Sequence, residues 1–176
     1  MKKIFFVLLI TLFAIKSYAQ AGDLTVGAKG AYMSKYEGFM YGLDVSYQLS
    51  PLLEVNLSGL MNTNIHVKDK YFGMAEYERK VAFYSGNLDL RFLLINAEMF
   101  STGPALGGQY AKFKIKQMDN SVVDDGTAWG FNVGWHIRVA VTDNLKLNGG
   151  WRYTSASEDQ SHHVFYLGAG YSFSLF

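Results

Sequence analysis

The 176-residue sequence has no cysteine, only two prolines and no long apolar run beyond its first fifteen residues. The lack of cysteine excludes a disulfide framework and thiol chemistry. After residue 19 no segment is apolar over the ~20 residues that a membrane-spanning helix needs. No segment rich in proline, serine or glycine marks a linker, so the sequence predicts one domain.

An excess of charge of one sign is also missing, because 16 basic residues face 15 acidic ones and the net charge is +1. Removal of residues 1–19, which hold three lysines and no acid, would leave 13 basic and 15 acidic residues and a net charge of −2. This balance predicts no nucleic-acid partner.

The N-terminus is typical of an exported protein. Lys2 and Lys3 precede an apolar stretch over residues 4–15, and Ser17 and Ala19 stand three and one residues before a predicted cut ahead of Gln20. The apolar stretch is too short to span a bilayer as a helix. The sequence therefore predicts a signal peptide over 1–19 and a mature domain over 20–176, with a signal anchor as the alternative.

Residues 129–141 alternate strictly between two kinds of side chain. Small or polar residues such as Asn132, His136 and Arg138 occupy the even positions. The odd positions hold the bulkiest apolar residues, Trp129, Phe131, Val133, Trp135, Ile137, Val139 and Val141. A period of two indicates a strand. Large aromatics on one face and small or charged groups on the other favour a strand with lipid outside and a narrow polar lumen inside.

Six further segments alternate in the same way, at 23–33, 39–49, 53–61, 82–92, 145–153 and 163–175. An eighth, at 98–112, contains Pro104, which cannot donate to a strand ladder, and predicts a local bulge near Gly103 and Pro104. The predicted fold is an all-β, eight-stranded, up-and-down antiparallel transmembrane β-barrel. Short connections are expected at 34–37, 50–51, 93–96 and 142–144, and longer ones at 64–80, 112–127 and 155–162. Since outer-membrane barrels keep short turns on the periplasmic side, both termini are expected in the periplasm.

Three segments carry a family resemblance: residues 102–107 (TGPALG), 150–154 (GWRYT) and 167–173 (LGAGYSF), together with the terminal Phe176. With them the chain resembles the small eight-stranded outer-membrane barrels of the opacity-porin and OmpA/OmpX type over its whole mature length. The resemblance implies an outer-membrane location. It also implies recognition of the last strand by the barrel-assembly machinery, although Phe176 is out of phase with Tyr171 and Phe173.

The inward positions of the predicted barrel carry many charges. An eight-stranded barrel is just wide enough inside for side chains to fill it. We expect a lattice of ion pairs and hydrogen bonds, with a narrow gated pore as the alternative. The predicted lattice contains Lys29, Asp44, Glu54, Asp89, Arg91, His136, Arg138, Lys146 and Arg152, interspersed with Asn56, Asn87, Asn132 and Asn148.

The sequence predicts no catalytic, cofactor or metal site and no enzymatic activity. Lipid A-modifying barrels of the deacylase type are marked by a His-x-Ser pattern on an outward strand face. The corresponding residues 153–156 (YTSA) lack this pattern. The acyltransferase type uses loop His, Asp and Ser groups around an apolar lumen pocket. Asp159, Ser161, His162 and His163 share one predicted loop here, but the lumen face is expected to be charged.

A basic patch is the most specific surface feature. Lys112, Lys114 and Lys116 alternate with apolar residues after Tyr110, and Lys80 precedes Tyr84 in the same phase. If these lysines point outward, they stand above the aromatic belt, where they would contact lipopolysaccharide phosphates. Ordinary loop solubility is the alternative, and a one-residue shift at Pro104 would turn the lysines inward.

The expected function is structural: an integral outer-membrane barrel that contacts lipid and displays its loops. The alternatives are a narrow passive pore, a surface adhesin or ligand-binding barrel, and a soluble lipocalin-like barrel. The expected partners are outer-membrane lipid, lipopolysaccharide and the barrel-assembly machinery, and the protein is expected to be a monomer.

Overall fold

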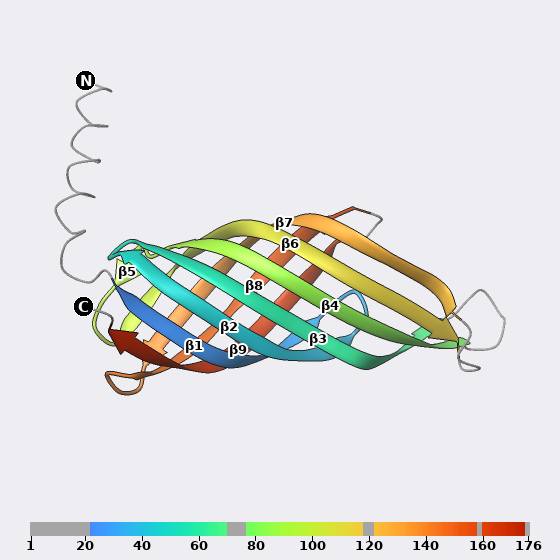
Figure 1. The fold of residues 1–176 in the computed structure, drawn as a ribbon, viewed down its shortest axis with the longest axis horizontal. Coiled ribbons are helices and arrows are strands. Elements are labelled where there is room, and N and C mark those ends of the chain that lie inside the picture. Colours follow the sequence, from blue (N-terminus) through green and yellow to red (C-terminus); the bar gives the residue numbers. More distant parts are fainter. Residues whose placement is uncertain (1–21, 70–76, 118–121, 158–159, 175–176) are drawn as a thin grey trace, which may run out of the picture.

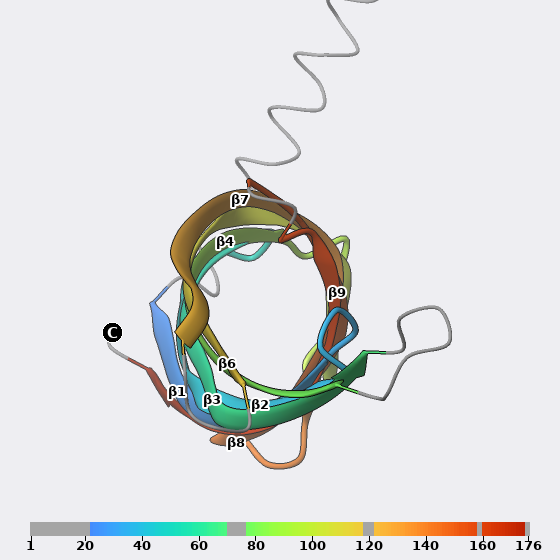
Figure 2. The same ribbon diagram turned by 90° about the vertical axis from the view of Figure 1, so that its right-hand side faces the viewer.

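The chain folds into a closed antiparallel barrel. A computed structural model describes residues 22–69, 77–117, 122–157 and 160–174. Consecutive long strands pair with one another, and β1 also pairs with β9, so the sheet closes on itself (Figures 1 and 2). The strands are β1 (Asp23–Met33), β2 (Gly38–Ser50), β3 (Leu53–Asp69), β4 (Tyr77–Phe92), β5 (Ile95–Asn96), β6 (Phe100–Gln117), β7 (Val122–Ala140), β8 (Leu145–Ala156) and β9 (His162–Ser174).

The predicted eight-stranded barrel is confirmed. The ninth strand, β5, has two residues, which pair with Ser101 and Thr102 at the start of β6. It lies in the connection between β4 and β6, which pair directly with each other, so eight strands form the wall. Among the described residues no helix is long and apolar enough to cross a membrane.

The alternation of the sequence becomes the two faces of the wall. On β7, Phe131 is 81% exposed whereas the adjacent Asn132 is 4% exposed. The same division holds on the other strands, where outward leucines, valines and aromatics are exposed and inward polar residues are buried. Apolar side chains on the outside of a closed barrel match a lipid environment.

The strands differ in length, and this corrects the predicted loops. β3, β4, β6 and β7 have 16–19 residues, whereas β1, β2, β8 and β9 have 11–13. The predicted loops at 64–80 and 112–127 are mostly strand, because β3 continues to Asp69 and β6 to Gln117. These long strands form one side of the wall, which extends further than the other side at one end of the barrel (Figure 1).

Pro104 causes no bulge, so that prediction is wrong. The register of β6 with β7 continues through Gly103–His136 and Pro104–Trp135, and among the described residues it shifts only between Ile115 and Lys116. On the other side of β6, the ladder with β4 ends at Ala105 and the ladder with β5 begins at Thr102. The proline therefore lies in a gap between two ladders, where its missing N–H costs no hydrogen bond on that side.

The start of β1 and the end of β9 lie at one end of the barrel, where Asp23 pairs with Ser174. The β2–β3 turn, the β4–β6 connection with β5 and the β7–β8 turn share this end, which we call the turn end (Figure 1). The opposite end, the mouth, carries the β1–β2 turn and the connections after β3, β6 and β8. Residues 1–21, with the predicted signal peptide, and residues 175–176, with Phe176, lie outside the described residues.

Candidate functional site

Glu54 is the centre of the polar network that fills the turn-end half of the lumen. Its Oε1 lies 2.8 Å from Nη1 of Arg91, and its Oε2 is paired with Nη2 of Arg138. All three side chains are buried, with Glu54 only 1% exposed. One carboxylate thus pairs with two guanidinium groups from different strands, which ties β3 to β4 and, across the lumen, to β7.

Asp89 is a second node of the same network. Its carboxylate accepts hydrogen bonds from Arg152 at 3.3 Å and from the Asn132 amide at 2.9 Å. At the rim of the turn end, Lys146 pairs with Asp23 at 3.1 Å. All nine predicted lumen charges are buried, as are Asn56, Asn87, Asn132 and Asn148.

Three predicted members of the lattice lie outside its ion pairs. Lys29 stands over the Tyr166 ring, with Nζ 5.2 Å from the centroid. Asp44 accepts a 3.4 Å hydrogen bond from the Asn56 amide. Among the described residues, neither ring nitrogen of His136 has a hydrogen-bond partner, although the side chain is fully buried. The lattice is therefore a set of pairs around Glu54 and Asp89, with other polar groups packed between them.

The mouth half of the lumen is apolar, which sequence reasoning missed. The expectation of a charged lumen holds for the turn-end half and is wrong for this half. The signal was present, since the inward phase of β6 continues beyond Gln109 into Phe113 and Ile115. A cluster of buried side chains fills this half: Ala31, Met33, Tyr36, Met40, Leu60, Ile65, Val81, Phe83, Ala111, Phe113, Ile115, Ala128 and Val164.

Polar groups cover the apolar cluster at the mouth. The Tyr36 hydroxyl donates a 2.6 Å hydrogen bond to Oε1 of Gln160, and burial raises the pKa of this phenol. The His162 ring meets Phe83 edge to face at 5.7 Å, and its Nδ1 lies 2.6 Å from the Gln160 carbonyl. These contacts hold the β8–β9 connection against the top of the cluster.

The loop groups considered for catalysis do not converge. His162 is buried in the mouth, whereas His163 is exposed and stacks on Trp151. Ser161 bonds to the backbone of Ala156, and Asp159 lies outside the described residues. Within the described part of the chain, no group of three or more His, Cys, Asp or Glu residues could hold a metal ion.

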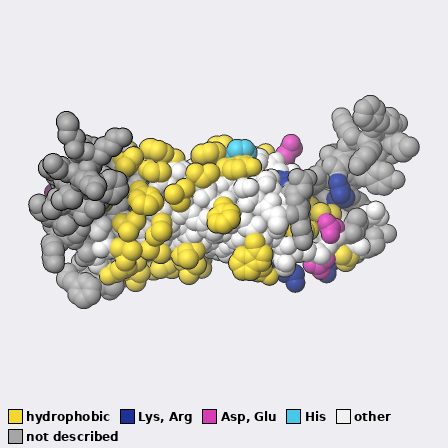
Figure 3. All heavy atoms as spheres, turned by 90° about the horizontal axis from the view of Figure 1, so that it is seen from above, with side chains coloured by type: hydrophobic (Ala, Val, Ile, Leu, Met, Phe, Trp, Pro, Cys, Tyr) yellow, Lys and Arg dark blue, Asp and Glu magenta, His cyan; other side chains and the backbone are white. Residues whose placement is uncertain are grey.

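The four lysines lie together on the outer face of the wall near the mouth. Cross-strand pairing places Lys80 of β4 opposite Lys116 of β6 and Tyr84 opposite Lys112. Phe113 and Ile115 are buried, so the register in which the lysines would turn inward does not occur. On the face shown in Figure 3, hydrophobic side chains cover the wall and charged side chains gather towards one end.

The lysines line a shallow depression, which we call the basic groove. It has a volume of about 400 Å³, and Thr63, Ala82, Tyr84 and Phe113 complete its lining. Lys114 pairs with Asp125 at 3.7 Å, and both side chains are exposed. Among the described residues no carboxylate lies within ion-pair distance of Lys80, Lys112 or Lys116.

The closed wall, the apolar outer face and the filled lumen define an integral β-barrel of the outer membrane. The profile of the outer membrane protein beta-barrel domain family matches residues 5–173, and the chain belongs to this family. No curated protein sequence matches the chain.

Three solved structures share the fold at low sequence identity. The N-terminal β-barrel domain of OprF from Pseudomonas aeruginosa has a TM-score of 0.66 at 16% identity, over 87% of this chain and 98% of that one. OprG from the same organism has a TM-score of 0.63 at 15% identity, over 88% and 97%. Ail, the attachment invasion locus protein of Yersinia pestis, has a TM-score of 0.57 at 16% identity, over 88% and 100%. The chain is thus an outer-membrane barrel that contacts lipid with its wall and displays loops at its mouth.

Proposed function

We propose that this barrel is a sealed, monomeric wall component of the outer membrane that binds lipopolysaccharide on its outer face. It conducts no solute, catalyses no reaction and binds no nucleic acid. Residues 1–19 direct its export, and the barrel-assembly machinery inserts it with both termini in the periplasm. The turn end then faces the periplasm, and the mouth with its basic groove faces outward.

The double filling of the lumen carries the proposal of a sealed barrel. An ion that enters from the turn end meets the paired charges around Glu54 and Asp89. Beyond them it meets Phe83 and Phe113, which are 1% and 2% exposed within an apolar cluster. An apolar constriction excludes water and ions, and a paired lattice leaves little room for them.

Planar-bilayer recording tests the seal. Purified barrel, shown to be folded by its shifted migration on unboiled gels, should insert without stepwise currents. A double variant, Phe83→Ser with Phe113→Ser, should let water into the mouth half and serves to detect conduction through a loosened lumen. Unitary currents from the unmodified protein would contradict the seal and favour a narrow pore.

The basic groove supports the lipopolysaccharide contact. Lys80, Lys114 and Lys116 lie nearer the mouth than the outward aromatic residues Tyr84 and Tyr110, and Lys112 lies opposite Tyr84. This position corresponds to the headgroup level of a barrel wall. Each lysine near a charged surface contributes about 1 kcal/mol, and the attraction weakens with salt. Replacing Lys80, Lys112, Lys114 and Lys116 by Gln should lower lipopolysaccharide co-purification, while folding in neutral detergent stays unchanged. If the quadruple variant retains as much lipopolysaccharide as the parent, the lysines serve only the solubility of the loops.

A further inference from the structure

Two apolar hollows lie below the basic groove on the same outer wall. The middle hollow, of about 370 Å³, shares Tyr84 and Lys112 with the basic groove. The lower hollow, of about 820 Å³, shares Gly86 and Tyr110 with the middle one. The shared residues make the three depressions one continuous track, which is centred on β3, β4, β6 and β7 and reaches β2 and the end of β8.

The strand register orders the chemistry along this track. Lys80 and Lys116 stand opposite each other nearest the mouth, and Tyr84 and Lys112 form the next pair but one on the outer face. Further down, the opposed pairs are Gly86 with Tyr110 and then Leu88 with Gly108. The wall therefore changes from cationic to aromatic to aliphatic in the direction away from the mouth.

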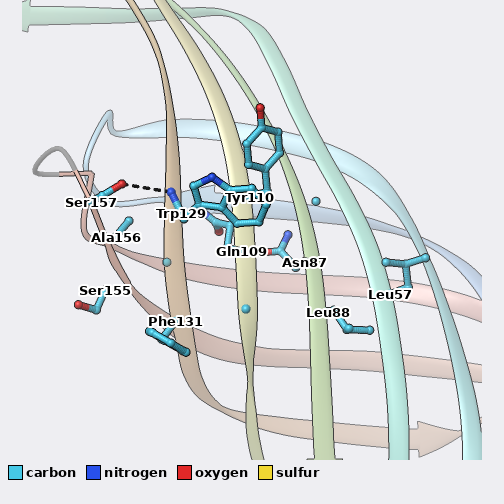
Figure 4. A pocket seen from close by; sticks show the side chains of 13 residues that line it. Leu57, Asn87, Leu88, Gln109, Tyr110, Trp129, Phe131, Ser155, Ala156 and Ser157 are labelled. Carbon is cyan, nitrogen blue, oxygen red and sulfur yellow. Dashed lines mark hydrogen bonds between the residues drawn. The ribbon is translucent and has the colours of Figure 1, made fainter.

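Outward glycines make the hollows. A Cβ added to Gly86 would meet no atom within 4 Å, and one added to Gly108 would come no closer than 3.8 Å to any atom. Gly59, which pairs with Gly86 across β3 and β4, is equally open, with its nearest neighbour at 3.9 Å. Larger neighbours stand around this bare backbone, as Leu57, Leu88, Tyr110, Trp129 and Phe131 do in the close view of Figure 4.

The length of the apolar part suits one leaflet. Tyr84 and Leu88 are four residues apart, so the two hollows extend about 13 Å along β4. Because the strands of such barrels tilt by about 40°, this length corresponds to about 10 Å of depth in the membrane. The apolar band of an outer-membrane barrel is about 25 Å tall, and half of it faces each leaflet. The hollows therefore follow an acyl chain of the leaflet nearer the mouth, directly below cationic groups at the headgroup level.

We propose that the basic groove and the two hollows form one site for a single phosphorylated lipid of the outer leaflet. A lipid phosphate lies between Lys80, Lys112 and Lys116, and one acyl chain lies over Gly59, Gly86 and Gly108. The inference rests on the proposed lipopolysaccharide contact and deepens it from a charged surface to a shaped site.

Charge and ring geometry support this occupant. Like charges directly opposite each other on a sheet destabilise it, and Lys80 and Lys116 are opposed without a carboxylate nearby among the described residues. A phosphate between them removes that repulsion. Below, the Tyr110 and Trp129 rings lie 4.6 Å apart and form one side of the lower hollow (Figure 4). Their faces suit contact with a hydrocarbon chain.

The test separates the headgroup from the chain with two probes: intact lipopolysaccharide and its fully deacylated form, which has lost both ester- and amide-linked chains and keeps the phosphates. A Cβ at Gly86 meets no atom within 4 Å, so Gly86→Leu places its side chain in the middle of the track. Gly30→Leu is the matched control, because Gly30 is an outward, equally open glycine on β1, away from the groove. Lys80→Gln with Lys112→Gln probes the headgroup, and Lys35→Gln, at the β1–β2 turn of the same end, is its control.

Binding is measured in neutral detergent at low salt, with folding of each variant checked by its urea midpoint. The double lysine variant should weaken binding of both probes, about fivefold for each lysine. Gly86→Leu should weaken the binding of intact lipopolysaccharide about tenfold, the value of two lost methylene contacts, and leave the binding of the fully deacylated form unchanged. Gly59→Leu should act in the same way. The two control variants should match the parent.

Three results would overturn the site. If the lysine variant weakens binding while Gly86→Leu and Gly59→Leu do not, the shaped site is wrong and the simpler lysine contact stands. If Gly30→Leu and Gly86→Leu weaken lipopolysaccharide binding equally, the hollow at Gly86 is not a specific site and both positions only contact lipid in general. If neither the lysines nor the glycines matter, the proposed lipopolysaccharide contact falls as well.

Discussion

At the scale of single residues, Glu54 is the one carboxylate among the described residues that takes part in two ion pairs. Its carboxylate pairs with Arg91 and Arg138, and none of these side chains has appreciable contact with solvent. Moving charges out of water is costly, and the cost is offset only while each partner is in place. The lattice therefore depends on this one acid more than on any exposed ion pair.

Glu54→Gln should be strongly destabilising, because it keeps the shape of the side chain and leaves two buried guanidinium groups without their carboxylate. Breaking a buried pair typically costs about 3–5 kcal/mol. The measurement is the urea midpoint of the refolded barrel. Asp125→Asn is the matched control, since its pair with Lys114 is exposed and such pairs contribute about 0–1 kcal/mol. Equal midpoints for both variants would mean that water enters the lattice.

At the scale of the strand, the two faces of β7 differ in environment: the outer face lies in lipid at increasing depth, and the inner face packs closely against β8. Its outward residues change from Thr127, beside Lys112, to Val133, opposite Leu106, in three steps of two residues. One of its inward glycines, Gly134, lies where β8 approaches closely, whereas the outward Gly86 on β4 faces open space. Position along a strand thus sets the depth of a side chain in lipid, and the face of the strand sets the space around that side chain.

Depth in the membrane predicts the cost of a charge on the outer face. Val133→Arg should destabilise the barrel by roughly 2–4 kcal/mol in lipid vesicles, because it places a cation near the middle of the apolar band. Thr127→Arg, on the same strand and face but at the level of the lysines, should cost about 0–1 kcal/mol. Reversible urea unfolding in vesicles measures both. A Thr127 variant as unstable as the Val133 variant would contradict the assigned depth.

Close packing predicts which glycines tolerate a methyl group. A Cβ at Gly134 would clash with the Trp151 carbonyl oxygen and lie 2.9 Å from the Arg152 Cα, so β8 would have to move. Gly134→Ala should therefore cost about 1–3 kcal/mol, as overpacking does. Gly86→Ala should leave the midpoint unchanged, since nothing lies within 4 Å of the new atom. The comparison fails if both substitutions have the same effect.

At the scale of the whole molecule, the barrel combines an inverted exterior with a lumen filled in two layers. The wall turns its aromatic and aliphatic residues outward, and its inside holds a polar lattice at the turn end and an apolar cluster at the mouth. The two layers stabilise the barrel by different means, one through paired charges and the other through hydrophobic burial.

The three tryptophans report on this inverted exterior together. All point outward: Trp129 and Trp135 are exposed, and Trp151 is half-buried. In vesicles of brominated lipid their fluorescence should be strongly quenched, and aqueous iodide should have little effect. Strong iodide quenching with no effect of bromine would indicate a barrel outside the membrane and would contradict the assigned outer face.

The local pattern of the sequence determined the wall. In a strand, successive side chains point to opposite faces, so Trp129 and Asn132 revealed their environments without any knowledge of their neighbours. Seven of the eight long strands could be predicted in this way, whereas the segment around Pro104 alternates less clearly. The outward phase of Lys112 could be predicted as well. Glu54 and Arg91 could be assigned to the lumen for the same reason.

The tertiary structure decided which side chains contact each other, because those contacts depend on which strands are neighbours and on the level at which they meet. Only the register shows that Glu54 serves both Arg91 and Arg138, and that His136 lies between charges without a hydrogen-bond partner among the described residues. The sequence around Pro104 predicted a bulge. In the structure the proline lies in the gap between the β4–β6 ladder and the β5–β6 ladder, and this gap depends on other segments of the chain. The apolar cluster around Phe83 and the outer track that passes Gly86 also depend on closure of the barrel. Both are built from residues far apart in sequence, which the stagger of the strands brings to one level.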